Sequence, residues 1–447
     1  MRIRTVVIVS LWLLVTALSS RAQEKDPRVA WLAANAVPIR SLDVGDDDFS
    51  DLEPLRATLK GVRVVMLGEQ THGDGTTFLA KNRLIRFLHE ELGFDVLAFE
   101  SGLYDCAKAW EFLAAGEAPE KAFPRGVFAI WSVSREVQPL VEYLGRRAKS
   151  DRPLELAGVD SQLTGSASTE LLVTDLAAFL SRIDPKLAKG KEWDRVAGVI
   201  GHLTKSSWEL GTEPVPSPRE QAAFARTIER WRTTIAARDR TPASQAWSGA
   251  FWRQLLTNLR LFAEQTWRTD YRDHAGNVPV FAMRDRQMGE NLLWLANERY
   301  PGRRIIVWGA TFHNARNLGT IAPGDAKRTR LYAGTAPMGE VAAKALGERL
   351  YSLGFTSYEG EAARAFSKTA TPLPPATAGS LEDLFARAGL TNAFLDFRKP
   401  SPGGQWLHAP LTARLLGHVE MRADWSRIVD GVVFLRKMER SRKVSAP

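Results

Sequence analysis

The chain of 447 residues has a single cysteine, Cys106. One thiol cannot form a disulfide within the chain, nor can it build a cysteine-based metal cluster. Stability must therefore come from packing, and a chain of this length that is 45% hydrophobic contains enough apolar material for a core. The composition excludes a disordered, collagen-like or coiled-coil protein.

The chain also lacks a strongly basic region of the kind that binds nucleic acid. Its formal net charge of +9 falls to +6 without the first 22 residues, and its lysines and arginines are scattered apart from a short basic stretch at 436–443. No nucleic-acid-binding motif is present. The sequence therefore predicts no nucleic-acid partner.

Long apolar runs are absent after residue 22. Before it, Met1–Arg4 is basic, Val6–Leu18 is almost entirely apolar, and Ser20–Ala22 resembles a signal-peptidase site. The apolar run is short for a bilayer-spanning helix, so the pattern favours a cleaved signal peptide over a retained anchor. We expect residues 1–22 to be a signal peptide, the protein to be periplasmic or secreted, and no stable membrane insertion after cleavage.

Common catalytic motifs are missing as well. The sequence has no Gly-x-Ser-x-Gly elbow, no Walker loop, no Gly-x-Gly-x-x-Gly after a strand and no His-Glu-x-x-His. These absences disfavour a common serine hydrolase, an NTPase and a dinucleotide oxidoreductase. The remaining possibility is a reaction with water that histidines and carboxylates activate, with or without a metal.

Short apolar runs predict buried strands at 62–67, 95–99, 154–159 and 305–308, with late strands at 394–397 and 432–435. Helical patterns lie between them, including 78–92 and 135–147. Alternating strands and helices predict an α/β fold with a mainly parallel sheet flanked by helices.

The segment 166–275 has a different pattern, with few β-branched runs and many Trp, Ala, Arg and Leu at helical spacing. We interpret it as an inserted α-helical subdomain or cap, broken by a proline-rich loop at 211–218. The α/β catalytic core is then formed by 23–165 and 276–447, and 367–380 is expected to be a surface linker. Five tryptophans are expected in the helix–helix core rather than in a ligand cage: Trp208, Trp231, Trp247, Trp252 and Trp267.

Polar side chains follow four of the predicted strands. Glu69 and His72 follow the first strand, Glu100 the second, Asp160 the third and His313 the fourth. Ligands of parallel α/β sheets bind outside the carboxyl ends of the strands, so these groups can converge on one site.

Glu69 and His72 lie three residues apart in a turn flanked by Gly68 and Gly73. A carboxylate beside an imidazole fixes its tautomer, which suits a general base. The alternative is that Glu69 only caps the helix that begins near residue 75, although Asp74 is better placed as a cap.

Arg284, Met288 and Asn291 follow the spacing i, i+4 and i+7 and therefore share one helix face. An arginine beside an apolar residue on an inward face needs an acidic partner or an anionic substrate group. A salt bridge to Glu100 or Asp160 is one interpretation, substrate binding is the other, and both can hold.

Together these residues resemble the erythromycin esterase family. The resemblance runs from about Trp31 to Lys437. It is carried by 67–73 (Leu-Gly-Glu-Gln-Thr-His-Gly), 92–94, 99–101, Trp131 with Glu136, 158–162 (Gly-Val-Asp-Ser-Gln), Arg284 and Asp285 with Met288 and Asn291, and Trp308 with His313 and Asn314. Ala310, Thr311 and Thr76 depart from residues that are common in the family, and the sequence does not give the substrate.

The resemblance implies a metal-independent hydrolase without a cofactor, in which His72 activates water against an ester or lactone bond of a small molecule. By the same resemblance Glu69 and Glu100 support the base or orient the water, and Arg284 and His313 face the substrate. Four further residues are expected to contribute to substrate binding: Asp160, Met288, Asn291 and Trp308.

Two alternatives stay open. His72, His313, Glu69 and Glu100 together have the ligand types of a zinc or iron site, which would make the protein a metal-dependent hydrolase. The same cleft could instead serve a binding protein without catalysis. In each case we expect the site residues to line one cleft at the carboxyl edge of the sheet, roofed by part of 166–275. The oligomeric state stays open.

Overall fold

The computed structural model describes residues 26–205, 207–271, 277–399 and 401–444. The predicted signal peptide, 1–22, lies outside the described residues. Among the helices of the described part, none is long and apolar enough to cross a membrane.

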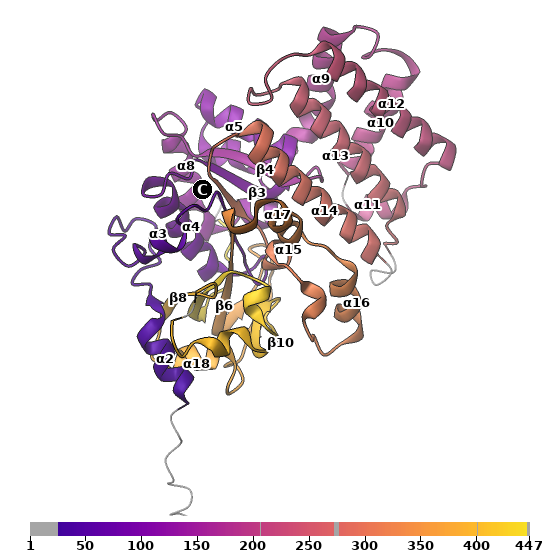
Figure 1. The fold of residues 1–447 in the computed structure, drawn as a ribbon. Coiled ribbons are helices and arrows are strands. Elements are labelled where there is room, and N and C mark those ends of the chain that lie inside the picture. Colours follow the sequence, from indigo (N-terminus) through magenta and orange to yellow (C-terminus); the bar gives the residue numbers. More distant parts are fainter. Residues whose placement is uncertain (1–25, 206, 272–276, 400, 445–447) are drawn as a thin grey trace, which may run out of the picture.

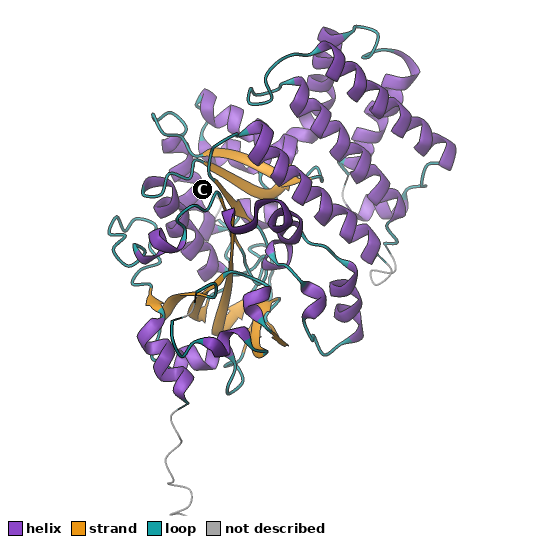
Figure 2. Ribbon diagram, viewed as in Figure 1, coloured by secondary structure: helices purple, strands orange, loops and turns teal. Residues whose placement is uncertain are grey.

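A nine-stranded sheet forms the centre of the molecule, in the order β1-β8-β11-β6-β2-β5-β3-β4, with β7 paired to β6 (Figures 1 and 2). The strands from β11 to β4 in this order run parallel, whereas β8, β1 and β7 pair antiparallel with their neighbours. The predicted α/β class with a mainly parallel sheet is confirmed. The strands are β1 (Val37–Pro38), β2 (Val64–Leu67), β3 (Val96–Gly102), β4 (Glu155–Asp160), β5 (Ile305–Trp308), β6 (Leu350–Ala362), β7 (Thr371–Leu373), β8 (Asn392–Asp396) and β11 (Gly431–Met438).

Alternate residues of the central strands enter different cores. Val65 and Leu67 of β2 pack in one core with α3 (Pro54–Thr58), α4 (Gly75–Glu90), α6 (Pro119–Gly126) and α8 (Gln138–Arg147). Val64 and Met66 pack in the other core with α14 (Val278–Trp294) and α17 (Met338–Leu346). Helix α5 (Leu103–Ala115) contributes to both cores. Helices therefore cover both faces, as a buried parallel sheet requires.

The described part of 166–275 is mainly helical and extends from the sheet at the upper right of Figure 1. Its helices are α9 (Ser166–Ile183), α10 (Gly190–Leu203), α11 (Ser207–Thr212), α12 (Pro218–Arg238) and α13 (Gly249–Arg268). Trp231 and Trp252 are buried in the core that these helices share with the sheet, and Trp247 and Trp267 pack against it. The side chain of Trp208 lies outside the described part.

The C-terminal part of the chain forms a third core with the first helix of the described part. Helices α2 (Pro27–Asn35) and α18 (Leu381–Arg387) pack there with β8, β11 and a two-stranded sheet of β9 (Leu411–Leu416) and β10 (Val419–Ala423). The remaining short helices are α7 (Ala129–Ser132), α15 (Thr311–Asn314) and α16 (Ala326–Gly334).

The predicted surface linker at 367–380 is mostly exposed, as expected, but part of it is a strand. Thr371–Leu373 form β7, which pairs antiparallel with the end of β6, and Leu373 is buried. Pro372 is tolerated because β7 pairs only with β6 and lies outside the main strand order.

Candidate active site

Adjacent strands β2, β5, β3 and β4 deliver the site residues to the carboxyl edge of the sheet. Glu69 follows β2, Glu100 lies near the end of β3, Asp160 ends β4, and His313 lies in α15 after β5. The β2 and β5 ends are joined by a hydrogen bond of 2.8 Å from the Thr311 N–H to the Glu69 carbonyl.

Glycine at position 68 is needed for this close approach, because a Cβ there would lie 2.4 Å from Oγ1 of Thr311.

The Glu69 carboxylate is fully buried and accepts hydrogen bonds from three side chains. Its Oε1 accepts hydrogen bonds of 2.8 Å from Nε1 of Trp131 and from Nδ1 of His72. Its Oε2 lies 2.6 Å from Nζ of Lys81, which is also fully buried. Burial lowers the pKa of Lys81, and the Glu69 carboxylate opposes that effect.

His72 is the partly exposed member of this group, with 22% of its side chain accessible. Since Nδ1 donates to Glu69, Nε2 is the nitrogen that can accept a proton. The ring also makes an edge contact with Trp131 at a centroid distance of 5.2 Å, which fixes its plane.

The turn that carries His72 is tied down by Asp74. Its carboxylate accepts hydrogen bonds from the Thr71 N–H (2.7 Å) and hydroxyl (2.6 Å), and it pairs with Nε2 of His418 at 2.8 Å. Although burial raises the pKa of Asp74, the charge of His418 keeps it below its usual value. Asp74 occupies the N-cap position of α4, but its side chain makes no capping hydrogen bond there. Asp74 is thus the better placed of the two residues, as expected, but its carboxylate serves the turn, and that of Glu69 binds His72, Lys81 and Trp131.

A second cluster forms around Arg284 of α14. Its guanidinium binds Asp160, with Nε 3.1 Å from both carboxylate oxygens and Nη2 2.5 Å from Oδ2, and Nη2 lies 3.1 Å from Oε1 of Glu100. Both salt bridges that the sequence left open are therefore present. The two carboxylates are buried, whereas 15% of the Arg284 side chain is accessible.

His313 joins the second cluster between two carboxylates. Its Nδ1 lies 2.6 Å from Oδ1 of Asp285, and its Nε2 lies 3.1 Å from Oε1 of Glu100. Burial disfavours the charged ring, but Asp285 and Glu100 outweigh it and raise the pKa of His313 to about 10. His313 is therefore a cation at neutral pH and is not available as a base.

Glu100 connects the two clusters. Burial alone would raise its pKa, but the charges of His313 and Arg284 hold that pKa well below its usual range. Its Oε2 accepts a hydrogen bond of 2.9 Å from the Ala310 N–H, and this oxygen would lie 3.2 Å from a Cβ on Gly309. The Gly309 carbonyl lies 3.4 Å from Nζ of Lys81 in the first cluster. The structure thus brings Glu69, His72, Glu100, Arg284 and His313 together.

A cavity of about 470 Å³ opens beside His72. Its walls come from the turn that carries His72, from Ala310, from the end of β6 and β7, and from the turn between β9 and β10. No residue of 166–275 lines this cavity in the described structure, so the expected helical roof is wrong for it. The reason is that α9–α13 pack around the β4 end of the sheet, whereas β6 extends past the end of β2 and brings its own loop over His72.

The four residues predicted to bind substrate are all buried. Asp160 is buried under Arg284, and Met288, Asn291 and Trp308 have no accessible surface. Asn291 donates to the Val159 carbonyl at 2.8 Å and so supports the β4 end of the sheet. A direct substrate contact by these last three residues would require them to become uncovered.

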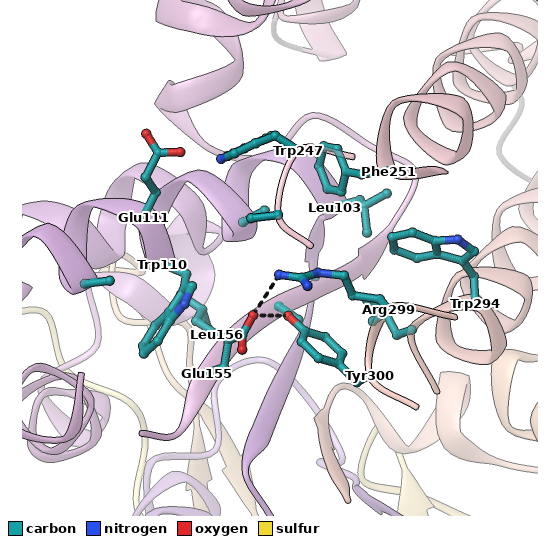
Figure 3. Close-up of a pocket in the computed structure, with 16 residues that line it drawn as sticks. Leu103, Trp110, Glu111, Glu155, Leu156, Trp247, Phe251, Trp294, Arg299 and Tyr300 are labelled. Carbon is teal, nitrogen blue, oxygen red and sulfur yellow. Dashed lines mark hydrogen bonds and ion pairs between the residues drawn. The ribbon is translucent and has the colours of Figure 1, made fainter. Parts of the chain in front are cut away.

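A more apolar cavity, of about 230 Å³, lies elsewhere, at the edge strand β4 (Figure 3). Trp110, Trp247, Phe251 and Trp294 line it. Its charged groups are already paired, Glu155 with Arg299 and the Tyr300 hydroxyl, and Glu111 with Lys108. None of the predicted catalytic residues lines this cavity. The expectation that they all line one cleft is also not met by the cavity beside His72, because His72 is the one predicted catalytic residue among the described side chains that line it.

The metal-site alternative fits the donor geometry poorly. Across the described ranges, no group of three His, Cys, Asp or Glu side chains is placed to hold a metal ion. The oxygens of Glu69 and Glu100 instead face N–H donors and cations, and these compete with a metal for the same lone pairs.

Sequence reasoning gave no role to several residues of the site. Lys81 falls at helical spacing with the buried Phe78 and Ile85, so a lysine on an apolar helix face was the available signal. Asp285 and Trp131 belong to the motifs that carry the family resemblance, but the motifs do not show that Asp285 contacts His313 or that Trp131 contacts Glu69. No local pattern pointed to His418, because it is 344 residues from Asp74.

Comparison with known proteins identifies the family. The protein-family model for erythromycin esterase matches residues 89–438. This range contains the cluster around Arg284 and begins after the turn with His72. The chain belongs to the erythromycin esterase family. The resemblance inferred from the sequence is thereby confirmed.

Curated relatives of this family member span nearly its whole length. It is 28% identical to the "Putative hydrolase YbfO" of Bacillus subtilis (strain 168) over 97% of both chains. It is 23% identical to an erythromycin esterase type II of Escherichia coli, over 91% of this chain and 97% of the relative. This erythromycin esterase family member is therefore grouped with hydrolases.

Solved structures share its fold. A succinoglycan biosynthesis protein superimposes with a TM-score of 0.75 at 18% identity, covering 94% of this chain and 98% of the other. A histidine-to-asparagine mutant of the erythromycin esterase EreC, in its open conformation, superimposes with a TM-score of 0.65 at 17% identity. The match covers 91% of this chain and 98% of the other. At these identities the likeness establishes the fold of the family member alone.

Proposed function

We propose that this protein is an exported hydrolase that cleaves an ester or lactone bond of a small molecule with water activated by His72. The observation that best supports this proposal is the His72–Glu69 pair, in which Nδ1 of His72 lies 2.8 Å from a fully buried carboxylate. The His72 ring also borders a cavity large enough for a small molecule. No metal or cofactor is required by this proposal.

In the proposed reaction, Nε2 of His72 takes a proton from water as the water oxygen attacks the acyl carbon. Glu69 stabilises the resulting imidazolium, and Lys81 and Trp131 hold Glu69 in place. The proton then passes from His72 to the departing alkoxide as the tetrahedral intermediate collapses.

Arg284 and His313 suit the role of donors to the developing oxyanion. Both are cationic, and both keep some accessible surface, whereas their carboxylate partners are almost fully buried. Neither lines the cavity beside His72 in the described structure, so the acyl group would have to reach past Ala310 to meet them. Nη1 of Arg284 has no carboxylate partner in the described structure and lies 3.3 Å from Nε2 of His313. A donor of this kind typically contributes about 10²- to 10³-fold in rate.

The test is a panel of chromogenic esters and a macrolide lactone, measured with the wild type, His72→Ala and a matched control, His408→Ala. His408 is exposed and bonds only to Ser426 among the described residues. We expect the wild type and the control to hydrolyse at least one ester, and His72→Ala to be about 10²- to 10⁴-fold slower. Absence of hydrolysis across the panel would reject the reaction class.

Export is proposed from the Met1–Ala22 pattern. N-terminal sequencing of protein from the native host is expected to give Gln23 or a neighbour as the first residue. An intact Met1 on a cytosolic protein would reject export and leave the hydrolase proposal in place.

A further inference from the structure

The cavity beside His72 has an unbalanced charge. Of the side chains that line it, His72, His418 and Arg364 can carry positive charge, and no Asp or Glu among the described residues lines it. The carboxylates of Glu69 and Asp74 behind the turn are fully buried and already engaged with Lys81 and His418, and Glu361, next to the lining residue Ala362, pairs with Arg440. The cavity therefore favours an anionic ligand group.

Arg364 has a fixed place relative to the turn that carries His72. The Ala363 N–H donates to the Gly73 carbonyl at 3.2 Å, directly after His72 in the chain. The two segments pack so closely that a Cβ on Gly73 would lie 2.8 Å from the backbone nitrogen of Arg364. The backbone of Arg364 is therefore held at the rim of the cavity, which its side chain lines.

The Arg364 side chain is exposed, and within the described ranges its guanidinium has no hydrogen bond or ion pair. The other positively charged side chains of the site, in contrast, are paired with carboxylates. Arg284 binds two carboxylates, and Lys81 and His418 each pair with one. A guanidinium that is not committed within the protein has all its donors available for a planar, bidentate contact with a carboxylate or a phosphate.

We propose that the substrate is an anionic ester or lactone, whose carboxylate or phosphate group is bound by Arg364 while the bond to be cleaved lies at His72. The proposal rests on the proposed function for the position of the scissile bond. Small residues on the cavity wall, among them Gly73, Ala310, Ala363 and Gly417, leave room for the substrate body between these two side chains.

The test uses 4-nitrophenyl esters of equal chain length that end in a methyl, carboxylate, phosphonate or ammonium group. The variants are Arg364→Gln and Arg364→Lys. The matched control is Arg330→Gln, because Arg330 is also exposed but lies in α16 and does not line the cavity. For the wild type we expect kcat/KM to be about 10- to 100-fold higher for the better anionic ester than for the methyl ester, the range expected for a charged hydrogen bond.

Arg364→Gln is expected to bring the ratio of anionic to methyl ester close to one, Arg364→Lys to give an intermediate ratio, and the control to keep the wild-type ratio. The carboxylate and phosphonate arms distinguish the two sources of negative charge. Equal ratios in the wild type and Arg364→Gln, or a preference for the ammonium ester, would overturn the proposal.

A binding measurement separates this inference from the proposed function. Calorimetric titration with glutarate and with inorganic phosphate is expected to show binding of one of them by the wild type, at least 10-fold weakened in Arg364→Gln. Loss of that binding in a protein that cleaves no ester would support the anion site and reject the hydrolase. Ester cleavage with glutarate and phosphate binding that Arg364→Gln leaves unchanged would reject the anion site and support the hydrolase.

Discussion

Lys81 shows how a buried cation holds the site. Its side chain is fully buried with Nζ 2.6 Å from Oε2 of Glu69, and it also lies over the ring of Trp308 at 4.3 Å. Replacing Lys81 with methionine leaves the Glu69 carboxylate buried without its cation. We expect this change to lower the free energy of unfolding by about 3–5 kcal/mol, as measured by denaturant titration.

Lys344→Met is the control, because Lys344 is 73% exposed and its pair with Glu340 is a surface pair. We expect it to cost about 0–1 kcal/mol. Equal effects of the two substitutions would mean that the buried pair does not stabilise the protein.

His313 predicts a pH dependence of stability. Its pKa is raised to about 10 from an ordinary value of 6.5, because Asp285 and Glu100 outweigh its burial. Its charged form therefore stabilises the folded state fully below about pH 6.5, and this contribution is lost as the pH rises toward 10. We expect the difference in free energy of unfolding between the wild type and His313→Gln to shrink over that interval. A difference that stays constant from pH 6.5 to 10 would contradict the assignment.

At the residue scale, the sequence predicted the charged groups but not all their partners. Glu69 with His72 was inferred from a spacing of three, and the pairing of Arg284 with Glu100 and Asp160 was one of two open interpretations. Lys81 carried a readable signal, whereas the contact of His418 with Asp74 depends on tertiary packing alone.

The hairpin of β9 and β10 supports the turn with His72 at the scale of elements. The Gly417 N–H donates to the Gln70 carbonyl at 3.0 Å, and His418 pairs with Asp74. Both turn residues have positive φ, 66° for Gly417 and 57° for His418, as tight hairpins require. His418 accepts this conformation while its imidazole holds a buried carboxylate.

We expect His418→Val to destabilise the protein by about 3 kcal/mol and to lower kcat at least 10-fold, because a β-branched residue is strained at positive φ and Asp74 loses its cation. His418→Asn should be milder in both respects, since asparagine tolerates positive φ and keeps a donor. Melting and ester hydrolysis of the two variants check this. Valine behaving like asparagine would show that neither the turn geometry nor the ion pair supports the site.

Elements with continuous apolar runs were predictable, and β6 shows why others were not. The prediction included β2, β3, β4 and β5 because their cores are runs of Val, Ile, Leu and Phe. β6 lies at the centre of the sheet, but Ser352, Gly354, Thr356 and Ser357 interrupt its pattern. Ser352 and Thr356 are buried because they find hydrogen-bond acceptors in the Asn314 carbonyl and Glu382, contacts that a local pattern cannot show.

For the whole molecule, the sequence predicted the layers but not which distant segments surround the site. The helical character of 166–275 follows from local periodicity. That these helices lie away from the cavity beside His72 cannot be inferred from it. The cavity is closed by 362–373 and by the β9–β10 turn, which lie about 300 residues or more from the turn with His72. Such contacts form only when the sheet order is set.

The single cysteine gives a prediction for the whole molecule. Cys106 is fully buried, and its burial raises the pKa of the thiol well above its usual value. A reducing agent is therefore expected to leave the melting temperature unchanged, and a thiol reagent to react only on unfolding. Thermal melting with and without dithiothreitol checks this. A shift of many degrees would indicate a bridge between chains.

The central claim is that His72 acts as the base, and chemical rescue tests it most directly. The initial rate of ester hydrolysis by His72→Ala is measured with increasing imidazole, against the wild type and with folding verified by circular dichroism. The account predicts a rate about 10²- to 10⁴-fold below the wild type without imidazole and a saturable recovery with it. A folded His72→Ala protein that hydrolyses the ester at the wild-type rate without imidazole would contradict it.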